Sequence, residues 1–153
     1  MSTSVTIEKL EHGRNLPLPS YATPQSAGMD LFAAIEVPIV IATGKSAVIP
    51  AGFCMALPPG YEAQIRSRSG LAARNGVVVL NSPGTIDADY RGEIKVILIN
   101  HGDATFIVEH GMRIAQMIVS PHASVNWHLQ DSLENDTERG SAGFGSTGLR
   151  ITG

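Results

Sequence analysis

The apolar and polar positions of the chain alternate in several short runs, a pattern that is typical of β-strands. In residues 61–66 every second position is apolar, and residues 123–129 repeat the pattern with Trp127 on the apolar side. Residues 92–99 alternate only at their start and are apolar throughout their second half. Because neighbouring side chains of a strand point to opposite faces, the first two runs predict strands with one buried face. The third run predicts a strand that is buried on both faces.

Glycine and proline interrupt the chain too often for long helices. The 153 residues include 16 glycines and 9 prolines, which are spread along the whole sequence. Residues 71–74 are the best candidate for a helix, and they allow only a turn or two. Short β-branched runs separated by turn signals are typical of sandwiches, jelly rolls and small barrels. The pattern therefore predicts an all-β, jelly-roll-like sandwich or barrel with at most one short helix.

Size and charge narrow the class of protein. A chain of 153 residues is long enough for one domain with its own core. The net charge of −3 argues against a nucleic-acid-binding protein, and apolar runs such as residues 96–99 are far too short to cross a membrane. Residues 1–20 contain no signal peptide, and the single cysteine, Cys54, is expected to fill core space. Together these features predict a cytoplasmic protein that binds neither nucleic acid nor membrane.

The C-terminal end differs in composition from the rest of the chain. Residues 140–148 read GSAGFGSTG, with Phe144 as the only large apolar side chain. A segment with so little apolar surface cannot hold itself on a core. It is either a frayed end or an arm that becomes ordered on an anionic, planar ligand. We therefore divide the chain into a β-rich domain, residues 1–138, and a flexible glycine-rich arm, residues 139–153.

The densest cluster of polar residues lies at residues 87–92 and reads DADYRG, after a turn signal at residues 81–84. In an extended segment Asp87 and Asp89 would share one face. Two such carboxylates suit a general base beside a magnesium-linked group. They equally suit capping of the turn and a salt bridge to Arg91. The residues alone leave both interpretations open.

A second candidate is the sequence RSRSG at residues 66–70, where the strand predicted at 61–66 ends. Arginine binds phosphate oxygens in a bidentate manner, and glycine lets backbone N–H groups approach an anion. An ordinary basic strand end is the alternative. The 5 histidines have no metal-binding spacing, and no serine lies in a nucleophile elbow. The enzyme chemistry that remains is direct attack of water on a phosphoryl group, with a metal ion held by phosphate oxygens and a carboxylate.

Taken in order, five segments resemble the five motifs of the trimeric deoxyuridine triphosphate nucleotidohydrolases (dUTPases). They are residues 27–31 (AGMDL), 68–71 (RSGL), 84–92 (GTIDADYRG), 111–116 (GMRIAQ) and 139–148 (RGSAGFGSTG). The resemblance extends from about residue 26 to residue 148 and so covers most of the chain. Ser67 departs from the family pattern, because many members have proline before the arginine of the second motif.

The resemblance implies a jelly-roll subunit that assembles as a homotrimer. Its active sites would lie between subunits, and the arm of one chain would close over a site built by the others. The implied reaction is the hydrolysis of dUTP to dUMP and pyrophosphate with Mg2+. This reaction limits the incorporation of uracil into DNA and supplies dUMP for the synthesis of dTMP.

The resemblance also implies roles for individual residues. Asp87 would be the base that orients and deprotonates the attacking water, a role commonly worth about 10²–10⁴ in rate. Asp30 would contact Mg2+ only through ordered water, because this ion usually keeps several of its water ligands. The substrate phosphates would hold the ion directly. The residues implied around the phosphates are Arg68, Ser69, Gly70, Gln116, Arg139, Ser146 and Thr147.

Nucleoside selectivity would come from the hairpin of the third motif and from the arm. The backbone of the hairpin would read the edge of uracil, and cytosine would leave buried polar groups unpaired there. Tyr90 would lie under the deoxyribose and exclude a 2′-hydroxyl group, and Phe144 would stack on the base. The residues implied in the nucleoside pocket are Asn81, Thr85, Ile86, Tyr90, Lys95 and Phe144.

Two other interpretations stay open. A deoxycytidine triphosphate deaminase on the same fold would use a glutamate for amine hydrolysis, whereas the third motif here contains Asp87. A non-catalytic jelly-roll module would bind nucleotides or proteins through the same pocket, and the intact Asp87 argues against lost activity. Release of ammonia from dCTP would favour the deaminase, and lack of turnover of any nucleotide would favour the binding module.

Overall fold

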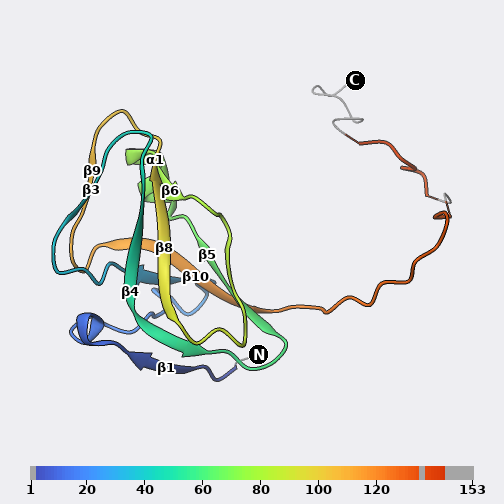
Figure 1. The fold of residues 1–153 in the computed structure, drawn as a ribbon, viewed down its shortest axis with the longest axis horizontal. Helices are drawn as coiled ribbons and strands as arrows, with labels where there is room; N and C mark the ends of the chain where they lie inside the picture. Colours follow the sequence, from blue (N-terminus) through green and yellow to red (C-terminus); the bar gives the residue numbers. More distant parts are fainter. Residues whose placement is uncertain (1–2, 135–136, 144–153) are drawn as a thin grey trace.

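The computed structural model describes residues 3–134 and 137–143 of the chain. These residues form a body of β-strands, from which the described residues after β10 extend away (Figure 1). In chain order the elements are β1 (Thr6–Lys9), the 3-10 turn η1 (Glu11–Gly13), β2 (Met29–Phe32), β3 (Ile39–Ile41), β4 (Ser46–Ala56), β5 (Tyr61–Arg66), α1 (Ser69–Asn75), β6 (Val77–Val79), β7 (Gly84–Ile86), β8 (Glu93–Asn100), β9 (Phe106–Val108) and β10 (Arg113–Pro121).

The strands form two four-stranded sheets and one two-stranded ladder. The first sheet has the order β1-β4-β8-β6, the second the order β2-β10-β5-β7, and β3 pairs with β9. The pairs are antiparallel, and hydrogen-bonded neighbours among the described strands are not consecutive in the chain. Such crossing connections are typical of jelly rolls. The prediction of an all-β fold with one short helix is confirmed, and α1 contains the predicted residues 71–74.

The core consists of aliphatic side chains from both large sheets. In β5, Ala63 and Ile65 are buried, as the alternation of residues 61–66 predicts. Val96 and Leu98 of β8 belong to the same buried cluster. Full burial of one such side chain stabilises a fold by about 1.5–3 kcal/mol. A one-residue slip in register would expose the set, so burial fixes the strand pairing.

Strand β8 corrects the prediction for residues 92–99. Its inward side chains are buried, but Ile97 and Ile99 on the other side are only half-buried. Val48, which pairs with Ile97 on the neighbouring strand, is 54% exposed. The apolar pattern predicted a covering layer on this side, which the described residues of one chain do not supply.

The prediction of a strand at residues 123–129 is wrong. Strand β10 ends at Pro121, and the described residues after it lie outside the body without joining a sheet (Figure 1). Trp127 and Leu129 are 90% and 101% exposed. The sequence alternates here as it does in a strand, but no strand of the described body pairs with it. The described residues after Pro121 thus extend away from the strands, and the division of the chain at residue 138 stays a prediction.

Cys54 is half-buried in β4, contrary to the expectation that it fills core space. Its register partners are Glu8 of β1 and Glu93 of β8. Burial, and to a smaller extent these two carboxylates, raise the pKa of the Cys54 thiol above its usual value. Because the thiolate is the reactive form, this cysteine is poorly suited to nucleophilic chemistry near neutral pH.

Gly52 is a position in β4 that does not tolerate a side chain. It has a φ of +76°, and a Cβ atom there would lie 2.5 Å from Cα of Gly13 and 2.7 Å from Cβ of Ala34. We expect Gly52→Ala to lower the free energy of unfolding by about 2–5 kcal/mol, because backbone strain adds to overpacking. Urea unfolding followed by circular dichroism measures this change.

The matched control for that substitution is Gly44→Ala. Gly44 has a φ of +74°, but no atom lies within 4 Å of the position its Cβ would take. In this variant the free energy of unfolding should fall only by the cost of a positive φ for a residue with a Cβ atom, about 1–2 kcal/mol. Equal losses at the two positions would contradict the close packing of Gly52 as the cause.

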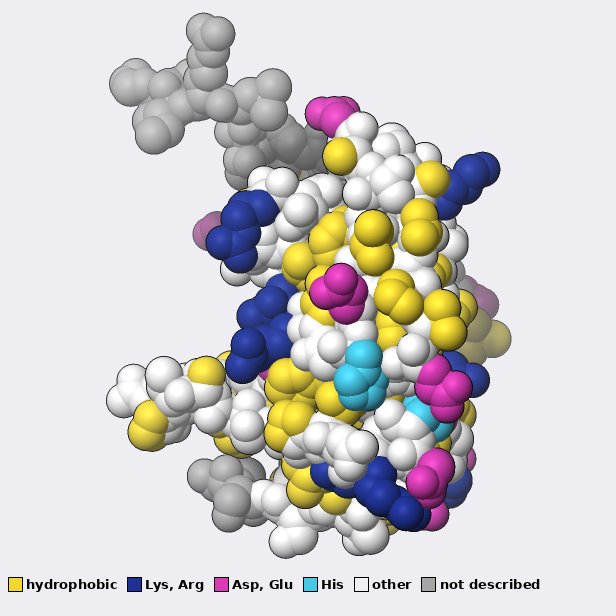
Figure 2. All heavy atoms as spheres, turned by 90° about the vertical axis from the view of Figure 1, so that its left-hand side faces the viewer, with side chains coloured by type: hydrophobic (Ala, Val, Ile, Leu, Met, Phe, Trp, Pro, Cys, Tyr) yellow, Lys and Arg dark blue, Asp and Glu magenta, His cyan; other side chains and the backbone are white. Residues whose placement is uncertain are grey.

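The surface carries charges of both signs. Figure 2 shows the left-hand side of the view in Figure 1, where acidic and basic side chains are interspersed and apolar side chains gather between them. On the β3–β9 ladder, the register partners Val40 and Ile107 are both exposed.

Within the part of the chain that the structure describes, no helix has the length and apolar character needed to span a membrane.

Candidate active site

An open pocket beside β7, which we call the hairpin pocket, brings together several of the predicted site residues. It is lined by Val48, Asn81, Thr85, Ile86, Asp87, Tyr90, Glu93, Lys95 and Ile97. The lining residues that sequence analysis had selected are Asn81, Thr85, Ile86, Asp87, Tyr90 and Lys95. The pocket therefore joins the segment around β7 to the outer side of β4 and β8.

The segment around β7 is not the predicted β-hairpin, because β7 pairs with β5 and β8 belongs to the other sheet. Local sequence explains its shape. Strand β7 pairs with β5, with Thr85 opposite Gln64. A Cβ atom on Gly84 would lie 3.2 Å from Nδ2 of Asn81. The glycine therefore lets the Asn81 amide lie close to the strand at the edge of the pocket.

Asp87 follows the end of β7, and its side chain is exposed to water. Its backbone carbonyl accepts the N–H of Tyr90 at 3.2 Å, which closes a turn. Arg91 donates to the carbonyls of Ala88 and Tyr90 at 2.6 and 2.9 Å. In the described structure Arg91 thus braces the turn through backbone oxygens and does not pair with a carboxylate. An exposed carboxylate in this position can accept a proton from a water molecule at the pocket.

A second polar cluster, which we call the Asp30 cluster, lies on the second sheet, where β10 runs between β2 and β5. Arg68 Nε donates to Oδ1 of Asp30 at 2.9 Å, and Arg113 forms an ion pair with the same carboxylate, with Nε 3.1 Å from Oδ2. The pairing of β10 with both neighbours sets Asp30 and Arg66 on either side of Gln116. Two guanidinium groups beside one carboxylate leave an excess of positive charge, which suits an anionic ligand.

Gln116 lies on β10, between Asp30 of β2 and Arg66 of β5. Its Nε2 donates to the carbonyl of Ser67 at 2.9 Å, and a Cβ atom on Gly28 would lie 2.5 Å from its Oε1. The Ser67 hydroxyl accepts the N–H of Val79 at 2.9 Å. Ser67, the departure from the family pattern, therefore ties the end of β5 to β6.

The hairpin pocket and the Asp30 cluster lie at different ends of β5. Strands β5 and β7 are antiparallel, with Ile86 opposite Ala63. Asp87 therefore lies beside the start of β5, whereas Arg68 follows its end. At about 3.3 Å per residue of strand, the two residues are roughly 20 Å apart. A single chain does not bring the two groups of predicted residues together.

The remaining predicted residues lie near the Asp30 cluster or in the arm. Ser69 and Gly70 are the first two residues of α1. Arg139 is exposed, and its Nε donates to the carbonyl of Ala142 at 3.0 Å. The other residues expected in the arm lie outside the described residues: Phe144, Ser146 and Thr147.

Two charged residues of the hairpin pocket and the Asp30 cluster were not selected from the sequence. Arg113 shares the carboxylate of Asp30, but in the sequence it is only one cation before an apolar strand. Glu93 lines the hairpin pocket. Its signal was the polar alternation with Lys95 at the start of β8, which points both side chains to the same side of the sheet.

The described residues do not form a magnesium site by themselves. Both carboxylate oxygens of Asp30 are paired with arginines, Oδ1 with Arg68 and Oδ2 with Arg113. No group of three or more histidine, cysteine or carboxylate side chains in the described ranges could hold a metal ion. Mg2+ prefers oxygen ligands and retains water. A carboxylate shared by two arginines is compatible with contact to the ion through water rather than with direct ligation.

The fold and these clusters define a jelly-roll β domain with sites for a small polar group and for an anion. The sequence model of the dUTPase family matches residues 14–148. A deoxyuridine 5′-triphosphate nucleotidohydrolase of Maricaulis maris is 55% identical over 98% of this chain and 100% of its own length. The chain belongs to the dUTPase family.

Further relatives agree with this assignment. A protein of the same name from Rickettsia bellii is 58% identical over 97% of this chain and 98% of its own length. A dUTPase of Staphylococcus bacteriophage 80alpha with dUpNHpp has a TM-score of 0.86 at 24% identity, over 97% of this chain and 100% of that chain. A dUTPase from phage phi11 of S. aureus, described with a structural Mg(II) ion, has a TM-score of 0.76 at 21% identity, over 86% and 99%. At these identities the structural similarity establishes the fold.

Proposed function

We propose that this protein hydrolyses dUTP to dUMP and pyrophosphate by attack of water on the α-phosphorus. The observation that carries the proposal is the hairpin pocket, in which the exposed Asp87 carboxylate lies beside polar groups suited to a nucleoside. The relatives at 55% and 58% identity are named for this substrate. Asp87 would orient the water and take its proton as pyrophosphate leaves. The reaction would keep uracil out of DNA and supply dUMP for the synthesis of dTMP.

Selectivity for uracil and deoxyribose would come from the hairpin pocket. The Asn81 amide and the backbone at Thr85 and Ile86 offer the donors and acceptors that the edge of uracil needs. Cytosine reverses donor and acceptor at that edge, which would leave buried groups unpaired at a cost of about 1–3 kcal/mol each. Lys95 would close this side of the pocket, and Tyr90 would exclude a 2′-hydroxyl group.

The triphosphate would be bound by the Asp30 cluster and by the arm. Arg68, Ser69 and Gln116 lie on one edge of the molecule, where their N–H and O–H groups would neutralise the charge that develops on the leaving pyrophosphate. The arm residues proposed to complete this shell are Arg139, Phe144, Ser146 and Thr147.

We propose Mg2+ as the cofactor, held mainly by phosphate oxygens, with Asp30 in contact through water. When bound, the ion would stabilise negative charge on the phosphates. The chain's own contribution would be to orient the hydrated ion through Asp30, whose carboxylate Arg68 and Arg113 hold in place.

The active unit is proposed to be a homotrimer with sites between subunits. The distance between Asp87 and Arg68 supports this proposal, because roughly 20 Å of strand keeps them from acting on one triphosphate. A second copy that presents its own Asp30 cluster to the hairpin pocket would complete the site.

The outer side of the β4-β8-β6 sheet offers a surface for that second copy. Val48 of β4 and Leu80, which follows β6, are 54% and 49% exposed. Ile97 lies on β8, the strand between β4 and β6. Burial of this apolar side would supply the association energy, at about 25 cal/mol per Å². Val48 and Ile97 also line the hairpin pocket, so a partner on this side would lie at the rim of the site. The apolar side chains on this side are Val48, Val78, Leu80, Ile97 and Ile99.

The test of the activity is pyrophosphate release from dUTP, dCTP, dTTP and UTP, each with Mg2+ and again with a chelator. We expect rapid release from dUTP alone, and a large fall when the chelator is present. Ammonia from dCTP would instead indicate a deaminase. No turnover of any of the four would indicate a binding module.

The test of the shared site is complementation between two inactive variants, Arg68→Ala and Asp87→Asn. Each variant alone should have little activity. After mixing, unfolding and refolding together, sites that combine the intact Arg68 of one chain with the intact Asp87 of another should restore part of the turnover. If the mixture stays as inactive as its components, both residues act within one chain.

Light scattering on the wild type would report whether the particle contains three chains.

A further inference from the structure

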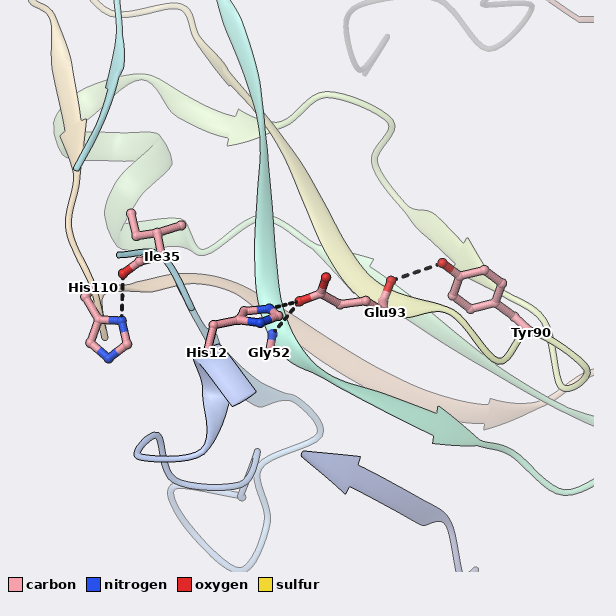
Figure 3. A network of polar contacts seen from close by, with 6 residues as sticks. All are labelled: His12, Ile35, Gly52, Tyr90, Glu93 and His110. Carbon is pink, nitrogen blue, oxygen red and sulfur yellow. Dashed lines mark hydrogen bonds and ion pairs between the residues drawn. The ribbon is translucent and has the colours of Figure 1, made fainter. Parts of the chain in front are cut away.

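A network of polar contacts links the N-terminal turn η1 to the hairpin pocket; we call it the Glu93 network (Figure 3). Oε1 of Glu93 lies 2.5 Å from Nε2 of His12 and accepts the N–H of Gly52 at 3.1 Å. The backbone carbonyl of Glu93 accepts the hydroxyl of Tyr90 at 3.0 Å. Glu93 and Tyr90 both line the hairpin pocket. A residue of η1 is therefore connected to the pocket through Glu93.

The carboxylate of Glu93 depends on these donors because it is largely buried. The side chain of Glu93 is 16% exposed and that of His12 is 31% exposed. An ionised carboxylate can only accept hydrogen bonds, so Nε2 of His12 carries the proton in this contact. A largely buried carboxylate that loses a donor must find another or move toward water. Removal of the histidine side chain would therefore shift Glu93.

The turn that carries the histidine is fixed by close backbone packing. A Cβ atom on Gly13 would lie 2.3 Å from the carbonyl oxygen of Gly52, and the N–H of Leu10 donates to the same oxygen at 2.9 Å. Gly52 lies in the bulge where the register of β4 and β8 shifts between Pro50 and Cys54. The turn η1, the bulge and the start of β8 are therefore packed together around the carboxylate.

The position of the Tyr90 ring depends on the start of β8. Tyr90 is 43% exposed, so little packing holds it. Its hydroxyl is anchored on the carbonyl of Glu93, and the ring lies against Gly92, where a Cβ atom would be 2.3 Å from the hydroxyl oxygen. His12 contacts the side chain of Glu93 and Tyr90 contacts its backbone carbonyl, so the ring would move if the start of β8 moved together with the carboxylate.

We propose that His12 is a positioning residue for the hairpin pocket. Through Glu93 it fixes the start of β8 and the ring of Tyr90, and so sets how strongly the pocket prefers deoxyribose over ribose. This inference rests on the proposed function, because it requires a nucleoside in the hairpin pocket. His12 does not line the pocket, so it acts through Glu93.

The test compares His12→Ala with His12→Gln, because the Gln amide nitrogen can take the place of Nε2. We measure kcat and KM for dUTP and UTP, and the binding of dUMP and UMP by calorimetry. For His12→Ala we expect KM for dUTP to rise about 5- to 10-fold with kcat nearly unchanged, the effect of one lost hydrogen bond. The preference for dUTP over UTP should fall by a similar factor. His12→Gln should restore most of both.

The matched control is His110→Ala. His110 also has a ring nitrogen near a protein oxygen, with Nδ1 2.9 Å from the carbonyl of Ile35, but it is not bonded to Glu93 (Figure 3). This variant should keep the wild-type KM and the wild-type preference. If His12→Ala fails to fold, Glu93→Gln replaces it and should show the same rise in KM, because a neutral amide holds His12 less strongly.

Two outcomes would overturn the inference. One is a His12→Ala protein that unfolds more easily but keeps the wild-type KM and preference, which would make the contact purely structural. The other is a fall in kcat without a change in KM. A wild-type protein that hydrolyses no dUTP would overturn the proposed function instead. In that case the ratio of dUMP to UMP affinity in the two His12 variants still decides the role of His12, and equal ratios in wild type and His12→Ala would reject it.

Discussion

Asp87→Asn should lower the turnover of dUTP by about 10²–10⁴, the usual contribution of a general base. The asparagine side chain has nearly the same shape but cannot take a proton from water. Because the remaining lining of the hairpin pocket is unchanged, affinity for a non-hydrolysable dUTP analogue should stay within a few-fold of wild type. Pyrophosphate release at saturating dUTP and calorimetry with the analogue measure the two quantities.

The control for this variant is Asp89→Asn, which makes the same change of charge two residues away. Asp89 is exposed and lies outside the hairpin pocket, so its variant should keep nearly full activity. Near-normal rates for Asp87→Asn would reject it as the base. Equal losses in both variants would point to the charge of the turn rather than to proton transfer.

Truncation after Arg139 should lower turnover by about a hundredfold, the loss that poor positioning of reacting groups commonly causes. It removes Phe144, Ser146 and Thr147, which are proposed to bind the base and the distal phosphates. Assembly and unfolding temperature should hardly change, because no described residue after Val119 packs against the core. Steady-state kinetics, light scattering and thermal unfolding measure the three quantities.

The control for the truncation is a chain that ends at Gly148. It lacks only residues 149–153, which match none of the five motifs, and it should be as active as the full chain. Unchanged turnover after truncation at Arg139 would reject the closing arm. A truncated protein that fails to assemble would instead show that the arm holds the subunits together.

The strands of the core were predictable because their signal is local. The alternation of residues 61–66 states which side chains face inward, and the structure buries Ala63 and Ile65 accordingly. The same signal misled at residues 123–129, where no strand of the described body pairs with the segment. Alternation reports that one side of a segment is apolar. It does not report what covers that side.

The candidate site was predictable where its residues are neighbours in the chain. The third motif placed Asp87 and Tyr90 in one short segment, and the structure puts both in the lining of one pocket, although the segment is not a hairpin. The pairing of Asp30 with Arg68 and Arg113 was not predicted, because it depends on the positions of β2 and β10 beside β5. The separation of Asp87 from Arg68 likewise follows only from the antiparallel pairing of β5 and β7.

The sequence by itself determined the all-β class, the short helix, the family and the residues that the family resemblance marks for chemistry. These follow from the period of the side chains and from motifs within short segments. The tertiary structure alone decided which distant side chains meet, such as His12 and Glu93, which are 81 residues apart in the chain. It also decided that Ile97 and Ile99 face outward rather than into the core. The physical reason is that burial and pairing depend on the order of strands in the sheets, which no local pattern of residues contains.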